Sequence, residues 1–440
     1  MKYKGTIRLF RGVVLLLSIL AFFVTSAGAA EYWLWAGQTN KKIPQMPGGT
    51  FVPVWGFCQD ANNNLVDGNG IDCTPTVPGP RITVPPGDNT LTIHLGNALP
   101  EPVSLNILGQ TLTNNTGPVW TSFPGNAVTS TENRAGGDTT SRVRSFSHET
   151  APGGTNNYIW GNFKVGTYLL QSGTNPAKQV QMGLYAPVTK DFAPGQAYEG
   201  IPYAREVLAL FSEVDPEIHA AIAGGYYGAS AGAPPAGKTA ITSSVFRQPR
   251  LFMINGRVHP EAALNPINPA IAAGETVLIR FLNAGLETKA PQILGTYMNL
   301  VAEDGVKRTH QQMLTAFEFG SAQTVDALVP SIAKGNYPLY DAMLHMSNEG
   351  QSPGGSLAYL NISADADTVS ITSARVNPAG DLVVRATSSA QPAAVLTAEG
   401  LGRLKWNGAL YVNTFPPPVP ASVTVTSNLG GTDTETVPFP

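Results

Sequence analysis

The chain has 440 residues, of which 42% are hydrophobic and only 13% are charged, and its formal net charge is −3. This near-neutral balance, without clustered basic residues in the body of the chain, argues against a nucleic-acid partner, which would require a basic face. The 46 Gly and 36 Pro residues, together with abundant Thr, Ser and Val, favour short strands joined by tight turns over helices.

The N-terminal segment is typical of an export signal. Four basic and no acidic residues precede an apolar run, Val13–Val24, and Ala27–Ala29 offers the small-x-small pattern that a signal peptidase cleaves. The run is too short for a comfortable membrane span, and an uncleaved anchor is the alternative interpretation. We therefore predict a signal peptide at residues 1–29 and a secreted or periplasmic protein with no membrane span after cleavage.

Two cysteines, Cys58 and Cys73, flank a polar stretch near the start of the mature chain. In an exported protein such a pair most simply forms a disulfide. Closing a loop of this size stabilises the fold by roughly 3 kcal/mol in the chain-entropy model. Thiolate ligation of a metal is the alternative, but it would require His partners, and the stretch between the two cysteines contains none.

The chain contains an internal repeat. Residues 80–98 and 269–284 each hold a short apolar stretch, a Gly turn, an alternating strand and the dipeptide Asn-Ala, and each is followed by a second matching pair of segments, at 166–185 and 335–360. Period-two alternation buries one face of a strand. Strands in this order, joined by Gly and Pro turns, predict two antiparallel Greek-key sandwiches.

One helix interrupts the predicted strands. In residues 215–223, Asp215 is placed to cap the helix and Pro216 to occupy its first turn. The Gly/Ala/Pro stretch from Gly224 to Gly237 predicts a mobile surface loop inside the second sandwich.

The end of the chain differs in character from the two sandwiches. Residues 365–440 hold strand-like segments separated by polar turns, which predict a small immunoglobulin-like β module that is only just long enough to fold. The predicted division of the chain is therefore a signal peptide at 1–29, a first sandwich at 30–194, a second at 195–364, and this module.

Six motifs are spread over nearly all of residues 50–362. They are residues 78–88 (PGPRITVPPGD), 252–257 (FMINGR), 277–285 (VLIRFLNAG), 301–305 (VAEDG), 337–345 (YPLYDAMLH) and 354–360 (GGSLAYL). Together they resemble the motifs of the multicopper oxidases. The resemblance implies that both sandwiches are cupredoxin-like, so the expected fold class is all-β with two tandem cupredoxin-like Greek-key sandwiches. It also implies a copper-dependent oxidoreductase family.

The copper ligands of that family are missing from the matching positions. A trinuclear copper cluster needs about eight imidazoles, and a blue copper site needs a Cys thiolate with two His. The two segments where the His pairs of the first domain belong are residues 103–110 (VSLNILGQ) and 170–175 (LQSGTN), and neither contains His. The family's third domain is replaced by the C-terminal module, which has no Cys and no His. We therefore expect the oxidase chemistry to be lost.

Four residues are the remaining metal-ligand candidates. His148 and Glu149 are adjacent, and a carboxylate that orients an imidazole serves both metal binding and base catalysis; a surface polar pair is the alternative. Met343 and His345 offer the soft ligands that Cu(I) prefers, although core packing by methionine is the alternative. No catalytic residue is predicted, and copper is the one cofactor that the resemblance suggests.

Two functions follow from these observations. The favoured hypothesis is a non-catalytic structural or binding protein of the cell envelope, with a protein partner there or in the extracellular space. The alternative is a copper-binding oxidoreductase of the multicopper oxidase type, with residual or partner-supplied copper sites.

Overall fold

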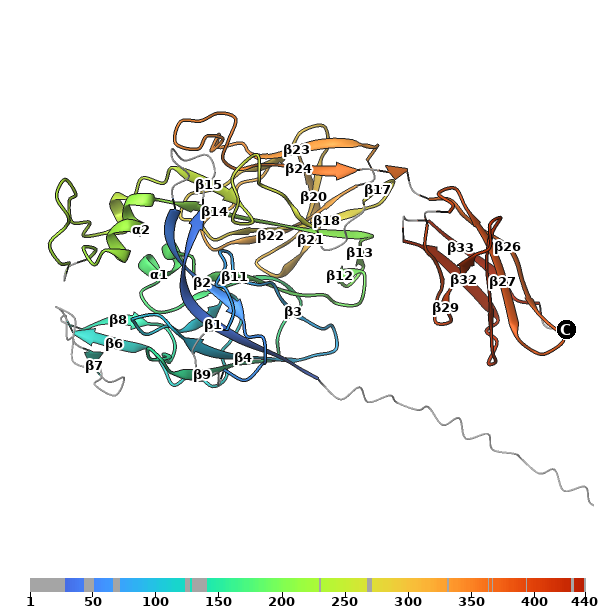
Figure 1. Cartoon of the computed structure of the whole chain (residues 1–440), viewed down its shortest axis with the longest axis horizontal. Coiled ribbons are helices and arrows are strands. Elements are labelled where there is room, and N and C mark those ends of the chain that lie inside the picture. The colour runs from blue at the N-terminus through green and yellow to red at the C-terminus, as the bar shows by residue number, and fades with distance from the viewer. Residues whose placement is uncertain are drawn as a thin grey trace, which may run out of the picture.

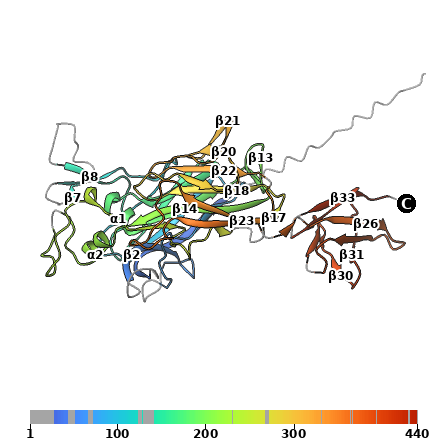
Figure 2. The ribbon, with the colours of Figure 1, turned by 90° about the horizontal axis from the view of Figure 1, so that it is seen from above.

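The protein is built almost entirely from β-strands, as predicted. Figure 1 shows two sandwiches stacked on each other and a smaller β module set apart from them, and Figure 2 shows the same separation from above. The computed structural model describes residues 28–42, 51–65, 72–122, 127–128, 141–228, 231–266, 271–330, 332–362, 364–365, 367–392, 394–428 and 431–438. Nearly all of the predicted signal peptide, residues 1–27, lies outside these ranges.

The first sandwich consists of two four-stranded sheets with the orders β2-β1-β4-β9 and β3-β11-β10-β5. Its core forms because alternate residues of each strand point inward, as Leu91, Ile93 and Leu95 of β4 do. The elements are β1 (Ala29–Lys42), β2 (Phe51–Gln59), β3 (Ile82–Val84), β4 (Thr90–Asn97), β5 (Leu105–Ile107), β9 (Thr155–Gly161), β10 (Gly166–Ser172), α1 (Pro176–Met182) and β11 (Tyr185–Lys190), with a small sheet of β6 (Val119–Ser122), β7 (Ala127–Val128) and β8 (Ser141–Ser145).

The second sandwich repeats this plan. Its larger sheet contains the path β15-β14-β18-β22, and a smaller sheet has the order β19-β23-β24. The elements are β14 (Arg205–Val214), α2 (Pro216–Ala223), the 3-10 helix η1 (Ser244–Phe246), β15 (Leu251–Ile254), β16 (Asn265–Pro266), β17 (Ala272–Ala273), β18 (Val277–Asn283), β19 (Pro291–Ile293), β20 (Met298–Glu303), β21 (Val306–Leu314), β22 (Thr324–Val329), β23 (Gly335–Asp341), β24 (Leu357–Ile362) and β25 (Ala364–Asp365), preceded by the hairpin β12 (Gln196–Tyr198) and β13 (Ile201–Pro202).

The strand pairings confirm that the two sandwiches are structural repeats. In the first, β1 runs parallel to β4 and antiparallel to β2, and β4 pairs antiparallel with β9. In the second, β14 runs parallel to β18 and antiparallel to β15, and β18 pairs antiparallel with β22. The strand pairs β5–β10 and β19–β23 correspond in the same way.

Helix α2 begins as the sequence predicts, because the Asp215 side chain accepts hydrogen bonds from the backbone N–H groups of the first turn. The structure places the helix and the segment that follows it against the first sandwich. Ile218 and Ile222 belong to the core of that sandwich, and Tyr227 and Ile241 pack against it. The Gly/Ala/Pro segment is therefore flanked on both sides by residues that pack against the first sandwich, and most of its described residues are exposed at the surface.

A buried arginine also connects the sandwiches. Arg280 of β18 has no exposed side-chain surface, and its guanidinium contacts Glu206, Asp191 and Asp326. It also donates to the Thr167 hydroxyl of β10 at 2.8 Å. Because this cation holds groups from both domains, it fixes their relative position.

The disulfide between Cys58 and Cys73 is present, as predicted. Trp33 and Trp35 share one face of β1 and pack with this disulfide and Leu65 in a small separate cluster. The Trp35 indole N–H donates to the buried Asp60 carboxylate at 3.0 Å.

The C-terminal module has its own hydrophobic core and two sheets, with the orders β26-β27-β31-β30 and β29-β28-β32-β33. It follows β25 of the second sandwich. Its strands are β26 (Val369–Val376), β27 (Leu382–Ser388), β28 (Leu396–Ala398), β29 (Gly402–Arg403), β30 (Lys405–Trp406), β31 (Tyr411–Phe415), β32 (Ser422–Ser427) and β33 (Thr432–Thr436). Among the described residues, no helix is long and apolar enough to cross a membrane.

Candidate functional site

The fold brings together the two segments of the first sandwich in which the family's copper ligands belong. Strands β5 and β10 pair antiparallel, and Gln171 lies opposite Asn106 in their register. Gly173 follows, and a Cβ at this position would lie only 2.5 Å from the Asn106 amide nitrogen. Amide side chains and a glycine therefore stand where the resemblance places imidazoles.

A buried hydroxyl network lies at this end of β10. The Ser104 and Ser145 hydroxyl oxygens are 2.7 Å apart, and Ser145 donates onward to the Ser147 carbonyl oxygen at 2.7 Å. The Thr174 hydroxyl donates to the Glu149 carboxylate at 3.1 Å. Ser104, Ser145 and Thr174 are fully buried. The network is thus closed by protein partners, as buried polar groups must be.

The side chains of Glu149 and its neighbour His148 bind different partners. Glu149 forms an ion pair with Arg144, whose Nε donates to Glu149 Oε1 at 3.1 Å. The His148 ring stacks on Tyr158 with a centroid distance of 4.4 Å, and its Nε2 lies 2.9 Å from the Asn157 carbonyl oxygen. The two side chains therefore do not form the imidazole–carboxylate pair that their adjacency suggested.

The equivalent end of β23 in the second sandwich holds an imidazole–carboxylate pair of a different kind. His345 Nδ1 lies 2.7 Å from Asp341 Oδ2. Burial alone would raise the pKa of the Asp341 carboxyl, but hydrogen bonds from His345 and from the backbone N–H groups of Ala290 and Met343 lower that pKa below its ordinary value. Asp341 is therefore an anchor for the 341–346 turn, and it orients the His345 ring.

His345 continues into a row of stacked and charged groups. The His345 ring stacks on the Phe252 ring with their centroids 4.2 Å apart. The Lys289 ammonium lies 4.9 Å from the centroid of the same Phe252 ring. Lys289 is fully buried and forms an ion pair with Glu213 at 2.9 Å. Met343, the fourth predicted ligand, is 48% exposed at the surface.

These side chains do not fit the copper centres of the multicopper oxidases. A blue copper site needs a thiolate with imidazoles, and both cysteines are in the disulfide. The equivalent strand ends supply hydroxyl, amide and carboxylate oxygens that already bind protein groups. Within the described ranges, no three His, Cys, Asp or Glu side chains gather in a way that could hold a metal ion. The four candidate ligands remain sequence-based predictions.

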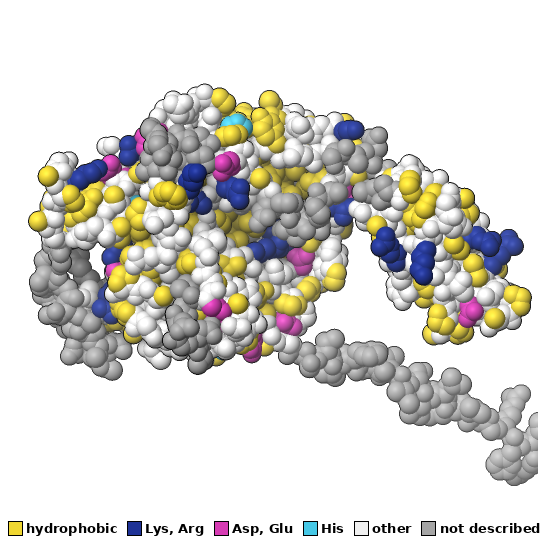
Figure 3. Space-filling model, viewed as in Figure 1, with side chains coloured by type: hydrophobic (Ala, Val, Ile, Leu, Met, Phe, Trp, Pro, Cys, Tyr) yellow, Lys and Arg dark blue, Asp and Glu magenta, His cyan; other side chains and the backbone are white. Residues whose placement is uncertain are grey.

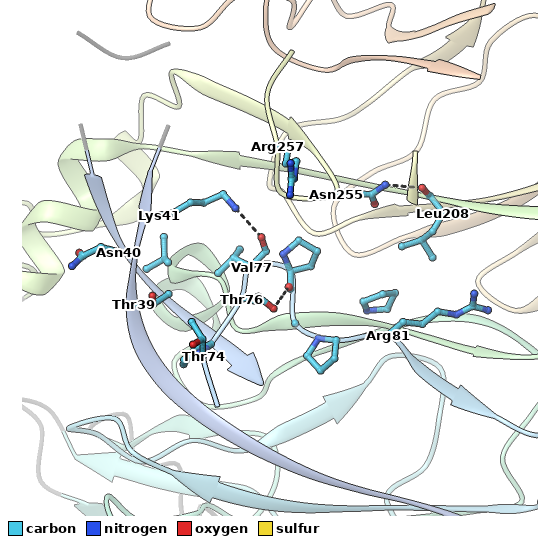
Figure 4. A pocket seen from close by; sticks show the side chains of 16 residues that line it. Thr39, Asn40, Lys41, Thr74, Thr76, Val77, Arg81, Leu208, Asn255 and Arg257 are labelled. Carbon is cyan, nitrogen blue, oxygen red and sulfur yellow. Dashed lines mark hydrogen bonds between the residues drawn. The ribbon is translucent and has the colours of Figure 1, made fainter. Parts of the chain in front are cut away.

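A cavity lies between the two sandwiches, and the residues that line it were not predicted from the sequence. It has a volume of about 480 Å³ and is lined by both domains. In Figure 4, Arg257, from the turn after β15, lies above Lys41, which comes from the end of β1. Thr39 and Thr74 lie below Lys41 in the same view. Figure 3 shows basic side chains in the middle of this face of the molecule. No periodicity or motif links residues 41 and 257, so only folding reveals the pair.

The comparisons with known proteins agree with this architecture. The multicopper oxidase family model matches residues 228–363. No curated protein matches the chain. Among solved structures, a blue copper oxidase from Nitrosomonas europaea is 16% identical with a TM-score of 0.53, and the match covers 76% of this chain and 86% of that one.

Two further structures give similar values. The multicopper oxidase mgLAC is 16% identical, with a TM-score of 0.52 and coverage of 77% of this chain and 87% of that chain. A copper nitrite reductase from Nitrosomonas europaea is 17% identical, with a TM-score of 0.51 and coverage of 77% and 95%. At these identities the structural likeness establishes the fold. Together with the family match in the second sandwich, it shows that the chain has two cupredoxin-like sandwiches and is similar to the multicopper oxidases.

Proposed function

We propose that this protein is an exported, multicopper-oxidase-like protein that has lost the type 1 and trinuclear copper ligands and acts without oxidase chemistry. In this proposal it serves as a structural or binding protein of the cell envelope. A cupredoxin scaffold is compatible with such a role, because fold alone does not determine function.

One observation carries the proposal. At the equivalent ends of β10 and β23, the side chains form two closed polar networks, one around Thr174 and one around Asp341. A copper ion would have to displace these hydrogen bonds and would gain mostly oxygen donors, which suit hard cations better than copper. We interpret both networks as sites where hydrogen bonds between protein groups have replaced a metal centre.

The test is the metal content of the purified mature chain. Residues 30–440 are loaded with copper, desalted, and examined for copper per chain, for a blue absorption band and for oxygen consumption with an electron-rich phenol. We expect no stoichiometric copper, no blue band and no turnover. Stoichiometric copper with a blue band or turnover would overturn the proposal.

The copper-binding alternative rests on His345. Its Nδ1 is held by the buried Asp341 carboxylate, which is how carboxylates orient metal-ligating imidazoles. The other ligands would come from a partner chain. If copper binds, His345→Gln should abolish binding, whereas the matched variant His310→Gln, at an exposed position of β21, should leave it unchanged. Copper bound equally by both variants would exclude His345 as the ligand.

The export part of the proposal has its own test. Fractionation of the expressing cells and N-terminal sequencing of the exported chain should give a mature protein that starts at Ala30, next to the predicted cleavage pattern. A chain retained with its first residues would contradict it.

A further inference from the structure

Two basic side chains, Lys41 and Arg257, line the cavity between the sandwiches. Lys41 donates to the Val77 carbonyl oxygen at 3.0 Å. In the part of the chain that the structure describes, neither Lys41 nor Arg257 forms an ion pair. A third cation of the cavity differs, because Arg81 is bound to Glu206 at 2.9 Å and to the Thr189 hydroxyl.

The surroundings of Lys41 leave its charge uncompensated. Burial and, to a lesser extent, the positive charge of Arg257 lower the pKa of Lys41 to about 8, and Glu261 only partly opposes both effects. Two like charges are thus held close together in a partly buried site, which costs free energy unless an anion lies between them.

The position of Arg257 is set by a tight turn. The backbone groups of Ile254 and Arg257 bond to each other, at 2.9 and 3.1 Å. Gly256 between them has φ +74, and a Cβ there would lie 2.0 Å from the Val77 carbonyl oxygen. Because Lys41 binds that same oxygen, the turn places the backbone of Arg257 close to the group that holds Lys41.

The walls of the cavity suit an anion with an apolar body. None of the described residues that line it is Asp or Glu. Thr39, Asn40, Thr74, Thr76 and Asn255 contribute hydroxyl and amide groups beside the basic side chains. The apolar lining residues are Val54, Pro75, Val77, Pro78, Pro80, Pro187 and Leu208. Cavities of this volume that combine apolar and polar groups are typical of small-molecule sites.

The chain itself offers little to neutralise the pair. Residues 43–50, which follow Lys42 in the sequence, contain no acidic residue. Glu261 lines a separate, smaller cavity of about 230 Å³ on the other side of Lys41 and Arg257, together with Lys42. Lys41 and Arg257 line both cavities, and the larger one has no acidic residue among its described lining residues.

We propose that this cavity binds a small molecule that carries a carboxylate or phosphate group, with the anionic group held between Lys41 and Arg257 and the rest of the molecule against the proline-rich wall. Guanidinium and ammonium groups together form strong, charge-assisted hydrogen bonds to such anions. This site is independent of the copper question, because it shares no residue with either strand-end network.

The experiment uses benzoate and phenyl phosphate as probes, titrated calorimetrically into the mature full-length chain at low salt. We expect saturable one-to-one binding of at least one probe. Lys41→Gln and Arg257→Gln should each weaken it about tenfold or more, the loss expected for one charge-assisted hydrogen bond. Arg385→Gln removes the same charge from an exposed position of the C-terminal module and should leave the affinity unchanged.

A gain-of-affinity variant keeps the test valid if the charge-loss variants fold poorly. Glu261→Gln removes the carboxylate that competes for Lys41, so it should strengthen binding while unfolding cooperatively like the wild type. Absence of saturable binding of both probes would overturn the proposal, and so would binding that either Lys41→Gln or Arg257→Gln retains at full strength.

Proton uptake gives a second readout that a purely structural lysine would not show. A bound anion favours the charged form of Lys41, so binding at pH 8 should take up protons. The charged groups that act on Lys41 are Arg257 and Glu261, and Lys42 and Arg81 also line the two cavities to which it belongs. Titrations in buffers of different ionisation enthalpy should reveal this uptake in the wild type and its loss in Lys41→Gln. Equal uptake in the two proteins would contradict the assignment.

Discussion

Asn97 and Asn283, which end equivalent strands of the two sandwiches, make the same hydrogen bonds at the same sequence offsets. Asn97 accepts from the backbone N–H of Leu99 at 2.9 Å and donates to the Glu101 carbonyl oxygen at 2.9 Å. Asn283 accepts from the N–H of Gly285 at 3.0 Å and donates to the Glu287 carbonyl oxygen at 2.9 Å. Both are fully buried. The repeated Asn-Ala dipeptide thus has a structural cause, because each Asn satisfies the polar backbone of the turn after its strand.

Removal of either amide should destabilise the protein. Asn97→Ala and Asn283→Ala each leave buried backbone groups without a partner, which costs about 1–3 kcal/mol. Denaturant unfolding followed by fluorescence measures the change. Asn336→Ala, at an exposed position of β23, is the control and should change stability by less than about 0.5 kcal/mol. Equal effects at all three positions would show that the turn bonds are unimportant.

The buried Arg280 should be essential for holding the sandwiches together. Arg280→Met removes the cation from three carboxylates, and breaking a buried ion pair in this way costs roughly 3–5 kcal/mol. We expect calorimetry to show a lower unfolding temperature and a loss of cooperativity between the domains. Arg308→Met, on the edge strand β21, removes only a partly exposed pair with Glu303 and should have a small effect. A wild-type unfolding profile for Arg280→Met would refute this role.

Because of His219, the stability of the protein should decrease as the pH is lowered. This residue of α2 is buried, and its Nδ1 lies 2.7 Å from the Pro53 carbonyl oxygen. Burial lowers the pKa of His219, although hydrogen bonds to backbone carbonyl oxygens and the nearby Asp215 oppose the shift. Above about pH 6.5, the pKa of an unfolded His, both states are neutral; below it, the unfolded state binds the proton more readily. Stability is therefore present above that pH and is lost as pH falls towards the folded pKa.

The slope of this loss identifies the group. The free energy of unfolding at a series of pH values from 7.5 to 5 should decline by at most about 1.4 kcal/mol per pH unit from this one residue. His219→Asn keeps a donor for the Pro53 carbonyl oxygen but cannot titrate, so its profile should be flatter. His310→Asn, at an exposed site, should keep the wild-type slope, and a steep slope in His219→Asn would assign the effect to other groups.

The disulfide should contribute measurably to the stability of the first sandwich. Replacing Cys58 and Cys73 by Ser should lower the free energy of unfolding by roughly 3 kcal/mol, through loss of the loop constraint. The double variant should be insensitive to reductant, whereas the wild type should weaken on reduction. Wild-type stability in the double variant would show that packing of Trp33 and Trp35 alone holds this region.

Much of the architecture follows from local sequence patterns. Alternation in residues 91–95, the Asn-Ala repeat, the Asp215 cap and the cysteine pair each act through neighbours in the chain, and each forms as predicted. The motifs of the cupredoxin-like strands are also short segments of the sequence. For this reason the fold could be predicted in detail.

The sites could not be predicted to the same extent. Adjacency suggested that His148 and Glu149 act together, but their side chains bind Asn157 and Arg144, because neighbouring residues in an extended segment point to different sides. Conversely, Asp341 holds His345 because a tight turn after β23 brings positions four residues apart into contact.

The sequence by itself determined the strands, the repeat, the disulfide and the absence of the family's histidine pairs, since all of these depend on residue type and short-range spacing. Tertiary structure alone decided that α2 anchors on the first sandwich, that Arg280 collects carboxylates from both domains, and that Lys41 and Arg257 line one cavity. The physical reason is that these contacts join side chains far apart in the chain, and their energies depend on burial and on the charges nearby, which no local pattern records.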